Sequence, residues 1–287
     1  MSTVLNSNGN SWFEVRPFFE VVDEKYSDMH ELVMKARELS MFIVRGHDCM
    51  IRFFLHAPLR IDAGIVSGIF KNAVAERMSP KTFSAPTVSY LKMKKHYALP
   101  IHRELQSRPQ LLYSTIEKMG RPCFIAVTAR YHDESYSISQ YVEKQLYAKP
   151  SLAGEILGMF IGSGSSSNNG QSKRSTSVER QSRADMAKEK QRLRHFHCNI
   201  AIGAESIDIA KSLMKVLSFN GDGFAIAGME RDSTYRMEVG RKPLLFADHF
   251  CVLSDIELAN IIALPGDPRA ARFNISRKGT YTTGPSV

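Results

Sequence analysis

The stretch HFHCNIAIGAESIDIAKSLMKVLSF, residues 195–219, sets the pattern from which the rest of the chain can be interpreted. Its first part, residues 195–202, is short and mostly apolar, as a buried β-strand requires. Ile209, Leu213 and Val216 then recur at helical spacing, which predicts a helix over residues 206–217. Farther on, Ser254 and Glu257 have the spacing of a capping box and predict the start of another helix. A strand followed by an amphipathic helix favours an α+β fold.

The same patterns extend on both sides of this stretch. Strands are predicted at residues 12–22, 49–56, 87–97, 123–131, 223–229 and 249–253. Helices are predicted at residues 27–39, 62–77, 110–119, 137–148 and 152–160, and a charged helix at 178–194. The alternation of strands and helices favours an open sheet with helices on one face.

A Gly-, Ser- and Asn-rich tract at residues 162–177 divides the chain. Its composition cannot bury apolar surface, so we predict a flexible linker. The linker would separate an N-terminal α+β module, residues 1–161, from a second one, residues 178–268, that begins with a basic helix. Residues 269–287 would be a C-terminal tail. The expected fold is therefore α+β, with two small sheet-plus-helix modules.

The composition is that of a folded, basic protein. Lys and Arg number 38 against 29 Asp and Glu, and the formal net charge of +9 favours an anionic partner such as nucleic acid or an acidic membrane surface. The four cysteines stand far apart without the spacing of a zinc site, so we expect reduced thiols in a cytoplasmic protein. The N-terminus lacks the pattern of a secretory signal, and the longest apolar stretch, residues 152–162, is too short to span a bilayer.

Several segments resemble the region that precedes the P-loop core in conjugative and type IV secretion-type DNA-translocating ATPases. In the first half they are FEVRPFFEV (13–21), CMIRFFLHAP (49–58) and RPCFIAVTAR (121–130). In the second half they are HFHCNIAIGAES (195–206) and LSDIELANIIALP (253–265), the latter with Leu253, Ser254, Glu257, Leu258, Ala259, Leu264 and Pro265 in the motif positions.

The resemblance implies a non-catalytic N-terminal module that assembles and tethers such an ATPase and presents DNA to it. A G-x-x-x-x-G-K-[ST] loop is absent from the sequence, so we expect the chain itself not to hydrolyse ATP. ATP and magnesium would then bind only to a P-loop motor domain or subunit outside this sequence, and the chain itself would hold no cofactor. The resemblance further implies an oligomer in the cytoplasm, with peripheral or partner-mediated contact to the inner face of the membrane.

The basic segment at residues 173–194 is the candidate DNA contact. Its phosphate-binding side chains would be Arg180, Arg183, Lys190, Arg192 and Arg194. A solvated helix surface explains the same charges equally well. A second basic cluster, residues 92–96, lies beside Tyr90 and Tyr97, whose rings can stack on bases. Lysines that protect an edge strand against sheet pairing are the favoured explanation of this cluster.

Two other functions fit parts of the sequence. His195 and His197 lie two positions apart on a strand, hence on one face, as in the metal site of HUH-type DNA nickases. Tyr141, in YVEK, would be the nucleophile of such an enzyme, although a third metal ligand is not evident from the sequence. The other alternative is a structural scaffold without a nucleic-acid role.

Overall fold

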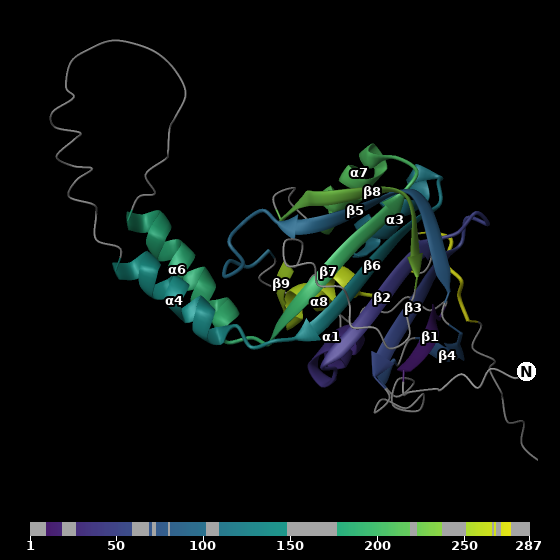
Figure 1. Cartoon of the computed structure of the whole chain (residues 1–287). Coiled ribbons are helices and arrows are strands. Elements are labelled where there is room, and N and C mark those ends of the chain that lie inside the picture. Colours follow the sequence, from purple (N-terminus) through teal and green to yellow (C-terminus); the bar gives the residue numbers. More distant parts are fainter. Residues whose placement is uncertain are drawn as a thin grey trace, which may run out of the picture.

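One antiparallel sheet organises the computed structural model of the protein (Figure 1). The structure describes residues 10–18, 27–58, 69–70, 73–79, 81–101, 109–147, 177–218, 223–236, 251–265, 267 and 271–276. Within these residues nine strands form the sheet in the order β4-β1-β3-β2-β6-β7-β5-β8, with β9 also paired to β7. The strands are β1 Asn10–Pro17, β2 Glu38–Arg45, β3 Ile51–Pro58, β4 Ala73–Met78, β5 Thr82–Met93, β6 Cys123–Tyr131, β7 His195–Ala204, β8 Phe224–Arg236 and β9 Cys251–Ser254.

Among the described residues, four helices cover one face of this sheet. They are α1 (Ser27–Lys35), α3 (Pro109–Met119), α7 (Ile207–Leu217) and α8 (Asp255–Ile262), and each contributes apolar side chains to the main core. Two further helices, α4 (Ser135–Tyr147) and α6 (Ser177–Gln191), lie away from this core. All four cysteines are unpaired thiols, and three of them are buried. None of the described helices is long and apolar enough to cross a lipid bilayer.

The opposite face of the sheet carries a second, aromatic core. Phe83, near the start of β5, has its ring centroid 5.7 Å from that of Phe54 and 5.8 Å from that of Phe42. The centroid of the Phe124 ring lies 6.0 Å from that of Phe83. Only three residues connect β4 to β5, so their facing ends lie within about 15 Å of each other. Because these strands stand far apart in the sheet order, the sheet must curve around this second core.

Gly203 provides the space that one of these aromatic rings occupies. It pairs with Phe124 across β6 and β7, and a Cβ atom at position 203 would lie only 2.0 Å from the Phe124 ring. Real Cβ atoms do not approach another atom so closely, so a side chain at this position must displace the ring. The glycine is therefore needed for the packing of the second core.

We expect Gly203→Ala to lower the free energy of unfolding by about 1–3 kcal/mol, because overpacking forces side chains and backbone to shift. Urea denaturation measures the loss. In a Phe124→Leu background the same substitution should cost clearly less. An equal loss in both backgrounds would show that the Phe124 ring is not the cause.

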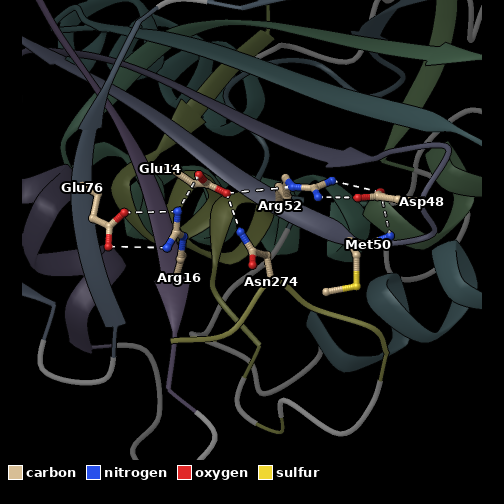
Figure 2. Close-up of polar contacts among 7 residues, drawn as sticks. All are labelled: Glu14, Arg16, Asp48, Met50, Arg52, Glu76 and Asn274. Atoms are coloured by element: carbon tan, nitrogen blue, oxygen red, sulfur yellow. Dashed lines mark hydrogen bonds and ion pairs between the residues drawn. The ribbon is translucent and has the colours of Figure 1, made fainter. Parts of the chain in front are cut away.

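A network of ion pairs ties together the strands at the β4 edge (Figure 2). Arg16 lies between Glu14, at 3.2 Å, and Glu76 on β4, at 3.1 Å. The Glu14 carboxylate also accepts a hydrogen bond of 2.6 Å from Asn274 and faces Arg52 on β3 at 4.0 Å. Glu14 thus connects β1 to β3 and to a segment near the C-terminus.

That segment, residues 271–276, corrects the prediction of a C-terminal tail from residue 269. Its backbone bonds to Ile51 on β3, and Phe273 is buried against Phe53 and Tyr113. Phe273 and Ile275, two positions apart, both pack on the main core, which explains why the segment folds onto the sheet.

Two predicted helices also require correction. The predicted helix at 27–39 ends at Lys35, and residues 38–45 form β2, which the sequence analysis missed. Residues 41–45 are buried on both faces of the sheet, so β2 lacks the alternation that marks a strand with one solvated face. The predicted helix at 62–77 is contradicted at residues 73–77, which belong to the edge strand β4.

The α+β class is confirmed, but the arrangement in two separate sheets is not. Strand β7, from the predicted second module, lies between β6 and β5 of the predicted first module. The reason is that β7 is buried along almost its whole length, so its backbone groups need partners on both edges. Residues 162–176 of the predicted linker and the predicted helix at 152–160 lie outside the described residues, and Ser177 already belongs to α6.

Because the two parts share one sheet, a break in the chain between them should not separate them. We expect a protein cut at a protease site inserted within residues 162–176 to elute from a size-exclusion column as one species. The fragments should part only in denaturant, since separation exposes the paired edges of β7. Two separately eluting folded fragments in buffer would contradict the shared sheet.

Candidate functional site

The helices α4 and α6 form an arm between two neighbouring strands. The chain leaves the sheet at the end of β6 and returns at the start of β7, and α4 and α6 pack together beyond the sheet (Figure 1). Their contact is a small apolar cluster that includes Ile138, Val142, Ala184 and Ala187. We call α4 and α6 the helical arm. A two-helix projection of this kind is exposed to partners on several sides.

His195 fastens the base of this arm. Its Nδ1 accepts a hydrogen bond of 3.4 Å from the Glu134 N–H, and its Nε2 donates to the Lys190 carbonyl at 2.9 Å. This arrangement fixes one neutral tautomer, and burial lowers the pKa of His195, which agrees with an uncharged ring. The prediction of His195 as a metal ligand is therefore wrong, because both ring nitrogens are already bonded within the protein.

His197 instead meets two side chains from the loop between β6 and α4. Its Nε2 lies 2.7 Å from Glu134 Oε1, and His132 Nδ1 lies 3.3 Å from the same oxygen. The two imidazole rings stack with centroids 4.2 Å apart and an interplanar angle of 17°. The three ligand atoms all lie within 4.8 Å of one another, so this trio could hold a divalent ion.

Glu134 is ionised in this setting. Burial disfavours its charge, but the hydrogen bonds from His197 and Ser137 outweigh that effect and hold its pKa below the usual value. The sequence analysis lacked Glu134 and His132 because they precede His197 by more than 60 residues. A His-x-Glu sequence at the end of a predicted strand was the available signal.

Tyr141 lies in a different cluster. Its ring stacks on His96 at 4.2 Å, and His96 stacks in turn on Tyr97 at 4.5 Å. Tyr141 is seven residues after Glu134, about 10 Å along the helix axis. The structure therefore does not assemble the predicted nickase set of His195, His197 and Tyr141.

Cations of the helical arm lie close enough to this stack of rings to affect its ionisation. Burial and the charges of Lys144 and Lys190 lower the pKa of His96. Burial raises the pKa of Tyr141, with a smaller opposing effect from Arg183. Lys95 precedes His96 and is exposed. We call His96, Tyr97, Tyr141, Lys95, Lys144 and Arg183 the arm-base cluster.

The predicted DNA contact at Lys190 is wrong. Its side chain is fully buried, its Nζ lies 2.9 Å from Glu257, and it donates to the Val252 carbonyl at 2.9 Å. Lys190 follows Ala184 and Ala187 at intervals of three along α6, so it continues the inward face of the helix. A buried, paired ammonium cannot reach a phosphate.

The other predicted DNA contacts are more accessible than Lys190. The surface of α6 that carries some of them is less basic than the sequence suggested. Arg183 and Arg192 are exposed, Arg180 is half-buried, and the guanidinium of Arg194 lies 4.8 Å from the centroid of the Tyr131 ring. Along α6 four basic residues accompany three acidic residues, and with Lys190 buried three of each remain. The helix by itself is therefore not a strongly positive surface.

No family model and no curated protein matches this chain. The function is therefore argued from the contacts, burial and charges of the described residues. These point to the base of the arm, where the trio and the arm-base cluster both involve α4.

Substitutions at the buried pair of Lys190 and Glu257 test whether this pair stabilises the fold. We expect Lys190→Met to lower the free energy of unfolding by about 3–5 kcal/mol, because the Glu257 carboxylate loses its countercharge inside the protein. Adding Glu257→Gln should recover much of the loss. Lys188→Met, on the outer part of the same helix, should change stability by less than about 0.5 kcal/mol.

The pH dependence of stability gives a second readout for this pair. Burial opposes ionisation of Glu257, but the charge of Lys190 and the hydrogen bonds from Ser254 and Ile101 hold its pKa below the ordinary value of 4.5. A lowered carboxyl pKa adds stability above pH 4.5 that is lost as the pH falls toward the folded-state pKa. The Lys190→Met/Glu257→Gln variant should lack this acid-dependent loss. If both proteins lose stability in parallel below pH 4.5, the pair is not its source.

Proposed function

We propose that this protein is a non-catalytic DNA-binding module that contacts single-stranded DNA through the base of its helical arm. The observation that carries the proposal is the arm-base cluster, in which three rings stack beside Lys144 and Arg183, and Lys95 is the exposed neighbour of His96 in the sequence. Aromatic rings with neighbouring cations are the combination that binds single strands without sequence preference.

The chemistry assigns separate tasks to the members of this cluster. The cations neutralise phosphates and release the counterions of the DNA. His96 lies between Tyr97 and Tyr141 in the stack, and its lowered pKa favours the neutral ring. The two half-buried tyrosine rings are then the aromatic surfaces offered to a base or sugar. Binding of this kind is weak, tolerant of sequence and sensitive to salt.

Within a larger assembly, the chain would act as the assembly and DNA-presenting part of a DNA-translocating ATPase. The resemblance of residues 195–206 and 253–265 to the pre-motor region of such ATPases supports this role. An arm projecting from a single sheet is also a suitable shape for handing a strand to a neighbouring motor (Figure 1). The motor would be a separate P-loop domain or subunit, and the assembly an oligomer in the cytoplasm, at most peripheral to the membrane.

The salt dependence of DNA binding tests the proposal. We expect the Lys95→Gln/Lys144→Gln/Arg183→Gln variant to bind a labelled oligothymidylate more weakly than the wild type. The slope of log K against log salt should flatten by about 0.7 for each lost phosphate contact, or roughly 2 for three contacts. Fluorescence anisotropy over a series of salt concentrations gives both quantities.

The control removes the same number of charges elsewhere. The control residues are Lys35, Lys118 and Lys215. They are exposed on α1, α3 and α7, which cover the sheet and do not belong to the helical arm. Their replacement by Gln should leave the slope close to that of the wild type. Equal slopes in the two triple variants would remove the arm-base cluster from the DNA interface, and absence of DNA binding by the wild type would favour a scaffold role.

A further inference from the structure

We propose that His132, Glu134 and His197 form a binding site for a divalent transition metal of the zinc class at the base of the arm. The trio comes from three places: His132 directly follows β6, Glu134 directly precedes α4, and His197 lies on β7. This proposal does not rest on the proposed DNA contact, because none of its three residues belongs to the arm-base cluster.

The distances already approach those of a metal site. Zinc bonds to imidazole and carboxylate measure about 2.0–2.2 Å, so tetrahedral ligand atoms stand roughly 3.3–3.6 Å apart. The two contacts to Glu134 Oε1 measure 2.7 and 3.3 Å, and none of the three separations exceeds 4.8 Å. Small rotations of exposed or half-buried side chains bring these atoms to the required spacing without a change of backbone.

The arrangement of the rings also favours an ion. The parallel stack of His132 on His197 places a nitrogen of each ring beside one and the same carboxylate oxygen. Without an ion, this oxygen accepts a hydrogen bond from His197 at 2.7 Å, and the His132 Nδ1 lies 3.3 Å from it. An ion among the three atoms would accept all three lone pairs at once.

Surrounding hydrogen bonds hold the ligands in position. The His132 N–H donates to the His195 carbonyl at 3.0 Å, and the Glu134 N–H is bonded to the His195 ring. Ser137 bonds to the Glu134 carboxylate. Asp133 lies between His132 and Glu134 in the sequence but does not belong to the trio. Its carboxylate accepts a hydrogen bond of 2.9 Å from the Ser135 N–H. Outer partners of this kind orient metal ligands and raise metal affinity.

The donor set indicates the class of metal. Two imidazoles and one carboxylate suit Zn²⁺ and similar ions, whereas Mg²⁺ and Ca²⁺ prefer oxygen ligands alone. Three protein ligands leave a coordination position for water, and 56% of the His132 side chain is exposed on this side. An ion would join the end of β6, the start of α4 and β7, and so hold the arm at a fixed angle to the sheet.

Equilibrium dialysis with Zn²⁺, after removal of metals with a chelator, tests the site in the full chain. We expect one ion bound through this trio. His132→Gln and Glu134→Gln should each weaken that binding by at least about 10-fold to 100-fold, the loss known for outer partners of metal ligands. The matched controls are His47→Gln, an exposed histidine in the turn before β3, and Glu143→Gln, an exposed carboxylate on α4. Neither control should change zinc binding, and Mg²⁺ should not compete.

Two further measurements separate loss of the site from loss of the fold. The metal-free His132→Gln protein should unfold at the wild-type temperature, because this side chain is mostly exposed. Hydrogen exchange in the first turn of α4 should slow on addition of Zn²⁺ in the wild type and not in the variant. Zinc binding by His132→Gln and Glu134→Gln with wild-type stoichiometry and affinity would overturn the site. Zinc binding without slower exchange would overturn its role in holding the arm.

Discussion

The base of the arm depends on the buried ion pair of Lys190 and Glu257. The Glu257 carboxylate accepts hydrogen bonds from the backbone of Ser254 and Ile101, so it joins α8 to the turn after β5. Lys190 adds α6 to this junction and bonds to Val252 on β9. Removing two charges from water is costly, and loss of either partner leaves the other charge buried without compensation. Here it joins the last turn of α6 to β9 and α8, a few residues before β7 begins.

A series of hydrogen bonds connects this pair to the trio of His132, Glu134 and His197. The Lys190 carbonyl accepts from His195, His195 accepts from the Glu134 backbone, and Glu134 meets His197 and His132. Each step fixes the orientation of the next group. The ion pair and the trio are therefore connected through His195.

Local signals predicted the elements well, and long-range contacts account for the failures. The capping box of Ser254 and Glu257 and the strand at residues 123–131 were predicted correctly, because neighbouring residues determine both. The same Glu257 also binds Lys190, a contact that spans more than 60 residues and could not be inferred from spacing. Strand β2 was missed because burial on both faces removes the alternation that identifies a strand.

The candidate site shows the same division. The period of two correctly placed His195 and His197 on one face of β7. This spacing could not predict that the His195 ring binds the backbone of Glu134, in the loop between β6 and α4. Nor could it predict that the same loop supplies the partners of His197. The sequence thus indicated that imidazole ligands lie on β7. Only the packing of the arm against the sheet identified which side chains meet there.

Both features at the arm base act through a single helix. Glu134 precedes the first residue of α4, and Ile138 and Tyr141 follow at spacings that place them on one side of the helix. Ile138 is fully buried between α4 and α6, so this side is also the one that packs. A group that fixes Glu134 to β7 therefore limits the rotation of α4 about its axis. Because Tyr141 and Lys144 are carried by the same rigid helix, that rotation sets their position relative to His96 and Lys95. The proposed metal and the proposed DNA contact would then be coupled by geometry alone, without any change in the residues that touch DNA.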